Sequence, residues 1–292
     1  MPSRRLFRSL IAICASLSAG WAAEAGTVVS QKFRSPILNR DWVYNVYLPD
    51  GYDSGKLRYP VMYLLHGNGA DQNEWVTLGN MQQTVDGLIR DGQMPPAIIV
   101  MPSATTTWYI DRKEMMETAF LKDLFPEVEG RFRVMKERTG RVIGGESMGG
   151  YGSLRFILKY PEMFAAAALI SPAIYNPEPP ETSSARRVGV FGAETYDPEV
   201  WKSFNYPTLL DGFFAKNLSV PVYVGSGDDD DFMIETQAAA FYGLWRQKKQ
   251  PGELRIHNGP HSFEAFNAQF PEAVRYIFRY VRRPEVISPE VQ

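Results

Sequence analysis

The sequence is poor in the two residue types that most often bind metals or carry thiol chemistry. It contains one cysteine, Cys14, and three histidines among 292 residues. Cys14 lies in an N-terminal segment that we expect to be removed. The remaining chain therefore has no disulfide, no thiol nucleophile and no thiolate metal site, and any catalytic nucleophile must be a residue of another type.

The apolar run near the N-terminus is too short to cross a membrane. It covers residues 10–19, follows three arginines and is followed by Ala23-Glu24-Ala25. This order of basic, apolar and small residues is typical of a signal peptide. We expect residues 1–25 to be cleaved, the chain to be exported to the periplasm or the cell exterior, and no stable insertion into the membrane.

The charge of the remaining chain argues against a nucleic-acid partner. Without residues 1–25 it has 28 Lys and Arg against 32 Asp and Glu, a net charge of −4. This balance does not favour nucleic acid or an anionic membrane surface as the main partner. The whole sequence is 45% hydrophobic, which is enough to fill one full core. We expect residues 26–292 to form a single domain.

Strand-like and helix-like segments alternate along the chain. This alternation predicts an α/β fold with a mainly parallel central sheet flanked by helices. The segment Pro172–Phe214, which is rich in proline, glutamate, serine and aromatic residues, interrupts the pattern. We expect it to be an insertion between strands six and seven, over the predicted pocket. The predicted strands lie near Val61, Ala97, Val142, Ala166 and Val222, and the predicted helices near Met81, Phe120, Leu154 and Phe241.

The pattern Gly-x-Ser-x-Gly around Ser147 carries most of the functional information in the sequence. A β-prone run precedes it, and an amphipathic helical pattern follows it from Met148 to Tyr160. This order is typical of a nucleophile elbow, in which the chain reverses sharply and exposes the serine hydroxyl. Gly145 and Gly149 leave room for that turn. The pattern therefore predicts that Ser147 is a nucleophile.

A serine hydroxyl needs a positioned base, and the chain has three candidate histidines. His66 directly follows an apolar strand and is best explained as part of the scaffold of the next loop. His257 ends an alternating strand, which is typical of a histidine at a sheet edge. His261 follows an Asn-Gly-Pro loop signal beyond the last strand, where the base is expected in the chain order serine, acid, histidine. We therefore predict that His261 is the base.

The acid of such a triad is expected after the penultimate strand. That strand runs into four consecutive aspartates, Asp228–Asp231. The run does not have the alternating ligands and the glycine of an EF-hand loop, so it does not predict that kind of calcium site. We expect one of the four to orient His261. The other three are expected to be N-cap and first-turn charges of the next helix, where the helix dipole favours carboxylates.

Together these motifs resemble the esterase D-like branch of the α/β-hydrolases. That branch includes feruloyl and acetyl xylan esterases, S-formylglutathione hydrolases, siderophore esterases and mycolyltransferases. The resemblance runs from about Phe33 to Val281 and implies an α/β-hydrolase fold. The matching segments are Val46-Tyr47-Leu48-Pro49, Tyr59 to Gly67, Trp108-Tyr109, Ser147 to Gly152, Gly227 to Phe232 and Gly259-Pro260-His261.

The resemblance also implies roles for individual residues. The family places its acid in a Gly-x-x-Asp-x-Phe/Leu pattern, which matches here at Asp230 and selects it over Asp231. The loop that begins at His66 is most similar to the His-Gly-x-Gly-x5-Trp loop of feruloyl-type carbohydrate esterases. That similarity implies an oxyanion hole formed by the backbone N–H groups of Asn68 and Met148.

Two activities of the family fit this sequence less well. The S-formylglutathione hydrolases carry a cysteine soon after the His-Gly of this loop, and this loop has none. The mycolyltransferases lack the loop histidine and use a glutamate as the acid. As a set, Trp108, Tyr175 and Trp201 are expected to contact the substrate, because aromatic rings suit stacking on sugar or phenolic rings. The alternative for each of them taken alone is that it fills the core, which is the more common role of a single aromatic residue.

These residues predict a secreted serine carboxylesterase that acts on feruloyl, acetyl or other sugar-linked esters. Its expected partner is a small-molecule or carbohydrate-linked ester, and the two-step acyl transfer requires no cofactor and no metal. One alternative is an acyltransferase of the same fold, in which a sugar hydroxyl replaces water. A second alternative is a carbohydrate-binding relative that has lost the chemistry.

Overall fold

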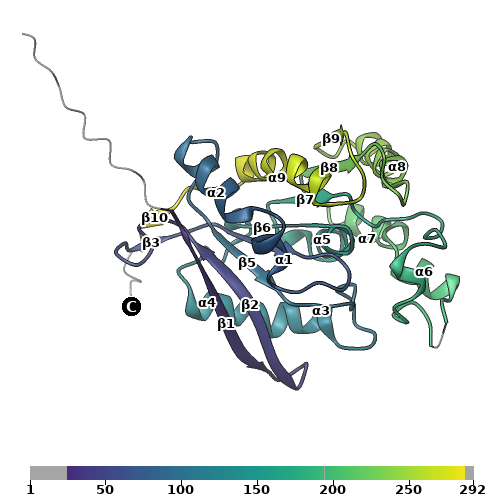
Figure 1. Ribbon diagram of the computed structural model, residues 1–292, viewed down its shortest axis with the longest axis horizontal. Coiled ribbons are helices and arrows are strands. Elements are labelled where there is room, and N and C mark those ends of the chain that lie inside the picture. The colour runs from purple at the N-terminus through teal and green to yellow at the C-terminus, as the bar shows by residue number, and fades with distance from the viewer. Residues whose placement is uncertain (1–24, 194, 287–292) are drawn as a thin grey trace, which may run out of the picture.

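The computed structural model describes residues 25–193 and 195–286, so nearly all of the predicted signal peptide lies outside the described residues. The described chain forms an eight-stranded sheet and a small two-stranded sheet (Figure 1). The strands are β1 (Thr27–Ser35), β2 (Arg40–Leu48), β3 (Leu57–Arg58), β4 (Val61–Leu65), β5 (Ile98–Pro102), β6 (Arg141–Glu146), β7 (Ala166–Ile170), β8 (Val222–Gly227), β9 (Gly252–His257) and β10 (Glu285–Val286).

The large sheet is antiparallel at one edge and parallel over the rest of its width. Its strand order is β1-β2-β5-β4-β6-β7-β8-β9, and only the β1–β2 and β2–β5 pairs are antiparallel. Every residue of β4, β5, β6 and β7 is buried. Uninterrupted burial is expected where helices cover both faces of a parallel sheet. The predicted mainly parallel sheet is confirmed.

Helices lie on both faces of this sheet and divide its core into two layers (Figure 1). Side chains of α2 and α9 pack on one face with Met62 and Leu64, and side chains of α4, α5 and α8 pack on the other with Tyr63 and Leu65. This split follows from the alternation of side chains along a strand. The helices are α1 (Glu74–Thr77), α2 (Met81–Arg90), α3 (Met116–Ala119), α4 (Phe125–Arg131), α5 (Met148–Lys159), α6 (Pro198–Phe204), α7 (Leu210–Ala215), α8 (Ile234–Gln247) and α9 (Phe263–Ile277), with a π-helical turn η1 (Phe120–Leu124) joining α3 to α4.

The helix after the nucleophile pattern has nearly its predicted length, whereas the last helix is shorter than expected. The sequence after His261 predicts a helical stretch from Phe263 to Arg283, but α9 ends at Ile277 and a 3-10 turn, Phe278–Tyr280, follows it. Arg283 precedes Pro284, and a residue before proline avoids helical backbone angles. The Arg282 N–H instead donates to Thr139 O at 2.9 Å, which directs the end of the chain toward the β3–β10 pair.

The insertion lies where the sequence places it. Pro172–Phe214 connects β7 and β8, which are the sixth and seventh strands of the large sheet in chain order. It contains α6 and most of α7 and has little regular structure before them. The Tyr151 hydroxyl of α5 donates to Phe204 O at 2.9 Å, so the insertion is tied to the helix that follows Ser147.

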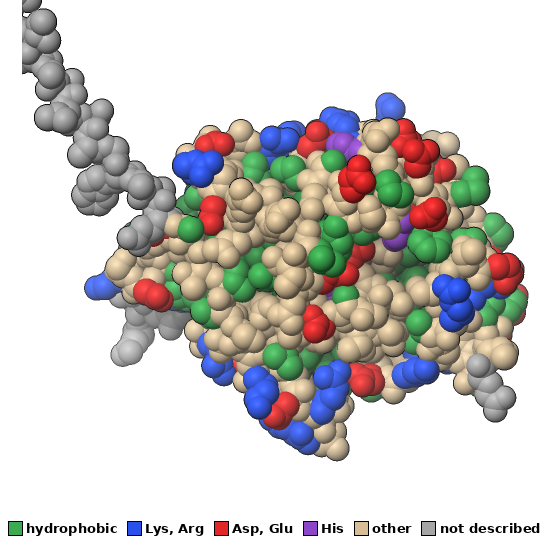
Figure 2. Space-filling model, viewed as in Figure 1, with side chains coloured by type: hydrophobic (Ala, Val, Ile, Leu, Met, Phe, Trp, Pro, Cys, Tyr) green, Lys and Arg blue, Asp and Glu red, His purple; other side chains and the backbone are tan. Residues whose placement is uncertain are grey.

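Charges of both signs are distributed over the surface. Figure 2 shows Lys and Arg side chains beside acidic ones at the lower edge, over the β1–β2 hairpin. Two ion pairs there join Lys32 to Asp41 at 3.4 Å and Arg40 to Glu114 at 2.8 Å. No helix within the described ranges has the length and apolar character needed to span a bilayer.

Candidate active site

Ser147 lies at a sharp turn between β6 and α5. Its backbone angles are φ 52° and ψ −115°, a region that non-glycine residues rarely adopt and that marks local strain. A Cβ atom on Gly145 or on Gly149 would come within 2.5 Å of Leu65 O, so only glycine fits at either position. The Ser147 N–H donates to Ile170 O and Ser171 O at 3.0 and 3.1 Å, which holds the turn against the end of β7.

The structure brings Ser147, His261 and Asp230 into one chain of hydrogen bonds. His261 Nε2 lies 3.0 Å from Ser147 Oγ, and His261 Nδ1 lies 2.6 Å from Asp230 Oδ2. The imidazole packs edge-on against Phe232 and Phe266, with ring centroids 4.9 and 5.0 Å away. These two rings restrict its rotation, so both of its nitrogens stay aligned with their oxygen partners.

Asp230 is the one aspartate of its run that faces His261. It follows β8, is only 5% exposed, and its Oδ1 accepts the Phe232 N–H at 2.9 Å. Its second oxygen is thereby free to accept from the imidazole. Asp231 is exposed at the surface.

The expectation that the remaining aspartates cap the next helix is wrong. That helix, α8, begins at Ile234, and its N-cap is Met233 in a left-handed conformation without a side-chain cap. Asp228 instead binds the loop before His261, because its Oδ1 accepts the Gly259 N–H at 2.9 Å. Two residues, Phe232 and Met233, thus separate the acidic run from the helix, and the Met233 N–H donates to Asp230 O at 2.8 Å.

His66 is fully buried within its loop. Its Nε2 accepts the Ala104 N–H at 2.7 Å, and its Nδ1 lies 2.6 Å from Gly67 O, so the tautomer with a proton on Nδ1 satisfies both contacts. Burial lowers the pKa of His66, which favours the same neutral form. These contacts fix the start of the loop that contains Asn68.

Asn68 and Met148, the expected oxyanion donors, lie at two neighbouring strand ends. Asn68 follows β4 by three residues, and Met148 is the first residue of α5 after β6. β4 and β6 are parallel neighbours, with Leu65 opposite Gly145, so the loops after them start from the same edge of the sheet. Within residues 25–193 and 195–286, neither backbone N–H has a hydrogen-bond acceptor.

The three aromatic residues expected to contact substrate are buried. Trp108, Tyr175 and Trp201 are 1%, 3% and 0% exposed. Trp108 packs edge-on against Tyr151 and Trp201, with ring centroids 5.2 and 6.0 Å away, and the Trp201 indole N–H donates to Pro177 O at 3.0 Å. In this structure they form a packed cluster between α5 and the insertion, which is the arrangement of core residues.

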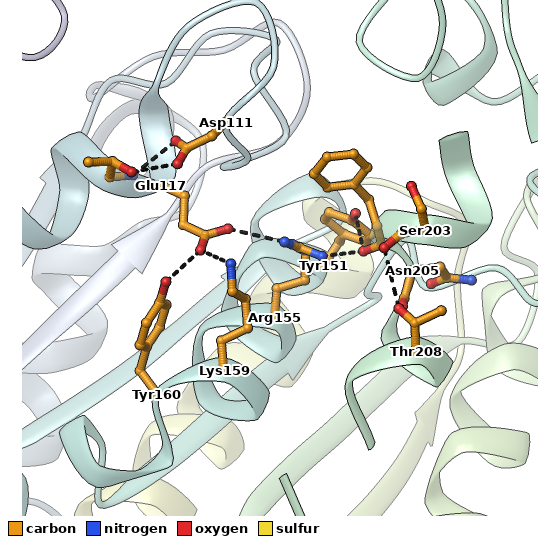
Figure 3. A network of polar contacts seen from close by, with 11 residues as sticks. Asp111, Glu117, Tyr151, Arg155, Lys159, Tyr160, Ser203, Asn205 and Thr208 are labelled. Atoms are coloured by element: carbon orange, nitrogen blue, oxygen red, sulfur yellow. Dashed lines mark hydrogen bonds and ion pairs between the residues drawn. The ribbon is translucent and has the colours of Figure 1, made fainter. Parts of the chain in front are cut away.

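A buried ion network around Glu117 and Arg155 was not predicted from the sequence. Glu117 accepts hydrogen bonds from Arg155 at 3.1 Å, from Tyr160 at 2.7 Å and from Lys159 (Figure 3). Burial alone would raise the pKa of Glu117, but the Lys159 hydrogen bond and the Arg155 charge together lower it. Arg155 also donates to Phe204 O, so the network joins α3, α5 and the insertion. The i, i+4 spacing of the two basic residues on one predicted helix was the available signal.

Sequence comparisons place the chain among esterases. The family described as "Putative esterase" matches residues 35–277. Over 163 residues the chain is 34% identical to an endo-1,4-beta-xylanase/feruloyl esterase of Xylanibacter ruminicola, an alignment that covers 52% of this chain and 22% of that protein. Over 146 residues it is 39% identical to an esterase of Mycobacterium tuberculosis, which covers 47% of this chain and 30% of that protein. The chain thus spans less than a third of the length of these curated relatives.

Solved structures of α/β-hydrolases share the whole fold. A ferulic acid esterase superposes with a TM-score of 0.77 at 26% identity, over 88% of this chain and 99% of that one. An S-formylglutathione hydrolase from Staphylococcus aureus superposes with a TM-score of 0.70 at 17% identity, over 87% of this chain and all of that one, and supports the fold alone. The family match spans the sheet from the end of β1 to the end of α9. The chain therefore has the α/β-hydrolase fold and belongs to the Esterase family.

Proposed function

We propose that this chain is a serine carboxylesterase in which Ser147, His261 and Asp230 form the catalytic triad. The observation that carries the proposal is the hydrogen-bond chain from Ser147 Oγ through the imidazole to Asp230 Oδ2, with distances of 3.0 and 2.6 Å. A neutral imidazole with its proton on Nδ1 accepts the serine proton at Nε2 as the hydroxyl oxygen attacks the ester carbonyl carbon. Asp230 then stabilises the imidazolium.

The reaction has two acyl-transfer steps. The first breaks the ester bond, leaves the acyl group on Ser147 Oγ, and returns the proton from His261 to the departing alcohol. In the second step, water gives a proton to His261 and attacks the acyl carbonyl. The bond from the acyl carbon to Ser147 Oγ then breaks, His261 returns the proton to Ser147 Oγ, and the acid is released. The negative oxygen formed in each step would be stabilised by the N–H groups of Asn68 and Met148. Neither N–H has a hydrogen-bond acceptor among the residues that the structure describes, which supports that role.

We infer that the natural substrate is an ester of a feruloyl-type aromatic acid on a carbohydrate. This inference is supported by the similarity to a structure of a ferulic acid esterase and to a relative named endo-1,4-beta-xylanase/feruloyl esterase. The export that we expect from the N-terminal segment fits such a substrate, because polymeric carbohydrates of this kind are outside the cell.

A fluorophosphonate probe followed by mass spectrometry of the labelled peptide tests the triad directly. We expect the label on Ser147 and no label after Ser147→Ala. Hydrolysis assays with methyl ferulate, acetylated xylan and p-nitrophenyl acetate test which ester is the substrate. The same assays with an added sugar as acceptor test whether the acyl group is transferred to water or to a sugar hydroxyl. Products in which the sugar carries the acyl group would establish an acyltransferase instead. An unlabelled wild-type chain without hydrolysis of any ester would exclude an enzyme of this class.

A further inference from the structure

Two carboxyl groups meet beneath the loop that contains the proposed oxyanion donor Asn68. Glu146 is the residue directly before Ser147 and is only 2% exposed. Its carboxyl and that of Glu74, the first residue of α1, both lie against the backbone of Gly67. Two ionised carboxylates held near each other would repel, so their proximity favours the protonated form of one of them.

Gly67 lies against both carboxyl groups. Its N–H donates to Glu74 Oε2 at 2.8 Å. A Cβ atom at this position would come 2.3 Å from Glu146 Oε1, so the Gly67 backbone rests directly on the Glu146 carboxyl. The next residue along the chain is Asn68. The carboxyl pair therefore includes the residue before the nucleophile, Glu146, and contacts Gly67, the residue before the proposed oxyanion donor.

The surroundings of Glu146 favour its protonated form. Burial raises the pKa of Glu146 well above its usual range, and the neighbouring Glu74 charge raises it further. The other ionisable groups at this loop are Tyr109, whose hydroxyl donates to His66 O at 3.1 Å, the neutral His66 itself and the exposed Asp71. None of them supplies a positive charge. Glu146 Oε1 is buried and has no hydrogen-bond partner among the described residues. A proton shared with Glu74 would give the Glu146 carboxyl a hydrogen bond, which a buried polar group needs.

We propose that Glu146 and Glu74 share one proton and act as a positioning pair for the oxyanion loop. The protonated Glu146 carboxyl donates a hydrogen bond to the Glu74 carboxylate. Glu74 Oε2 also accepts the Gly67 N–H. The pair fixes the distance between Ser147 and the Asn68 N–H. The tetrahedral intermediate bound to Ser147 must place its oxyanion within hydrogen-bond distance of that N–H. Glu146 and Glu74 touch no reacting atom, and this role rests on the proposed esterase function.

Two substitutions at position 146 separate positioning from packing. Glu146→Met keeps the length of the side chain but removes the donor, and replacing a buried polar group with an apolar one of similar shape is often neutral for stability. Glu146→Gln keeps a donor that cannot ionise. With p-nitrophenyl acetate at pH 7, we expect Glu146→Met to lower kcat by about tenfold to a hundredfold, which approaches the effect of removing one oxyanion donor. KM should change by less than about threefold, because the substrate-binding surface is unchanged. Glu146→Gln should recover most of that loss.

A substitution at Glu74 tests the same pair without changing a residue of the buried strand β6. Glu74 is only half-buried, so Glu74→Met should fold, and it should lower kcat in the same way because the Gly67 N–H loses its acceptor. Asp71→Asn is the matched control, since this exposed carboxyl lies in the same loop and its oxygen still accepts the Asn73 N–H. We expect its kcat to match that of the wild type, and the melting temperatures of all variants show that they are folded.

The outcomes distinguish this proposal from the proposed function. Wild-type kcat in both methionine variants, or a glutamine variant as slow as Glu146→Met, would overturn the positioning pair while Ser147→Ala remains inactive. An active Ser147→Ala chain in the same assay would overturn the esterase mechanism itself.

Discussion

Asp228 Oδ1 accepts a hydrogen bond from the Gly259 N–H at 2.9 Å, and this contact joins the loop after β8 to the loop after β9. Two backbone bonds support it, from Asp228 N–H to His257 O at 2.8 Å and from Asp229 N–H to Gly259 O at 3.2 Å. A Cβ atom on Gly227 would come 2.0 Å from Gly259 O, so the loops are in direct contact there. The acid and the base of the proposed triad are therefore carried on loops that are bonded to each other.

We expect Asp228→Ala to lower kcat about fivefold, because one hydrogen bond that holds the histidine loop contributes about 1 kcal/mol. Asp228→Asn should have a smaller effect, since its amide oxygen still accepts the Gly259 N–H. Esterase kinetics with p-nitrophenyl acetate measure both. The control is Asp229→Ala, whose exposed side chain can be removed without touching Gly259. Equal rates for Asp228→Ala and the wild type would show that the backbone bonds alone position the loop.

Ser147→Ala should lower kcat by about five to six orders of magnitude, and His261→Ala should do nearly the same, because nucleophile and base act as a unit. Steady-state hydrolysis of p-nitrophenyl acetate measures the loss, and circular dichroism shows that the variants are folded. His257→Ala is the matched control for the base, since this histidine contacts Tyr223 and Glu272 at the sheet edge. A Ser147→Ala enzyme with more than about a tenth of wild-type activity would contradict the triad.

Asp230→Asn should lower kcat by about four orders of magnitude, because an asparagine holds the imidazole in the wrong tautomer. Asp231→Asn should be close to wild type, since that carboxylate is exposed at the surface and contributes little there. The same kinetic assay compares the pair. If Asp231→Asn is the inactive variant and Asp230→Asn is active, the hydrogen bond at 2.6 Å between Asp230 and His261 does not hold during catalysis.

The Glu117 network predicts a specific loss of stability in acid. The pKa of Glu117 is lowered below 4.5 in the folded protein, so its ionised form stabilises the fold above that pH, and this contribution is lost as the pH falls through the lower folded value. We expect Glu117→Gln to be less stable than wild type at pH 7 and to lose less stability between pH 5 and pH 3. Urea denaturation midpoints across this range measure the difference. Parallel curves for the two proteins would exclude the linkage.

Trp201→Ala should act through the core of the protein. The side chain is fully buried, and removing a buried tryptophan destabilises a protein by about 3 to 5 kcal/mol. We expect a lower melting temperature and similar relative losses in kcat/KM for methyl ferulate and p-nitrophenyl acetate. A change in the ratio of these two values without a loss of stability would instead make Trp201 part of the substrate pocket.

The sequence alone determined the features that depend on local pattern. Alternating strand and helix segments, with a full core, predicted the mainly parallel sheet and the position of the insertion. The glycines around Ser147 predicted the sharp turn, because only glycine tolerates the close approach to Leu65 O that the turn requires. These features are local because backbone sterics and side-chain period act between residues that are near in the chain.

Only the tertiary structure decided which distant side chains meet. The order of motifs indicates that the acid is one of four aspartates. The contact between His261 and Asp230 depends on the packing of the loop after β8 against the loop after β9. The burial of Trp201 was likewise decided by the tertiary structure, because nothing in the neighbouring sequence indicates that an aromatic residue of the insertion is fully buried against α5. The Glu146–Glu74 pair likewise joins segments 72 residues apart in the numbering. Burial and proton sharing are properties of packing in space, and a linear pattern does not encode them pair by pair.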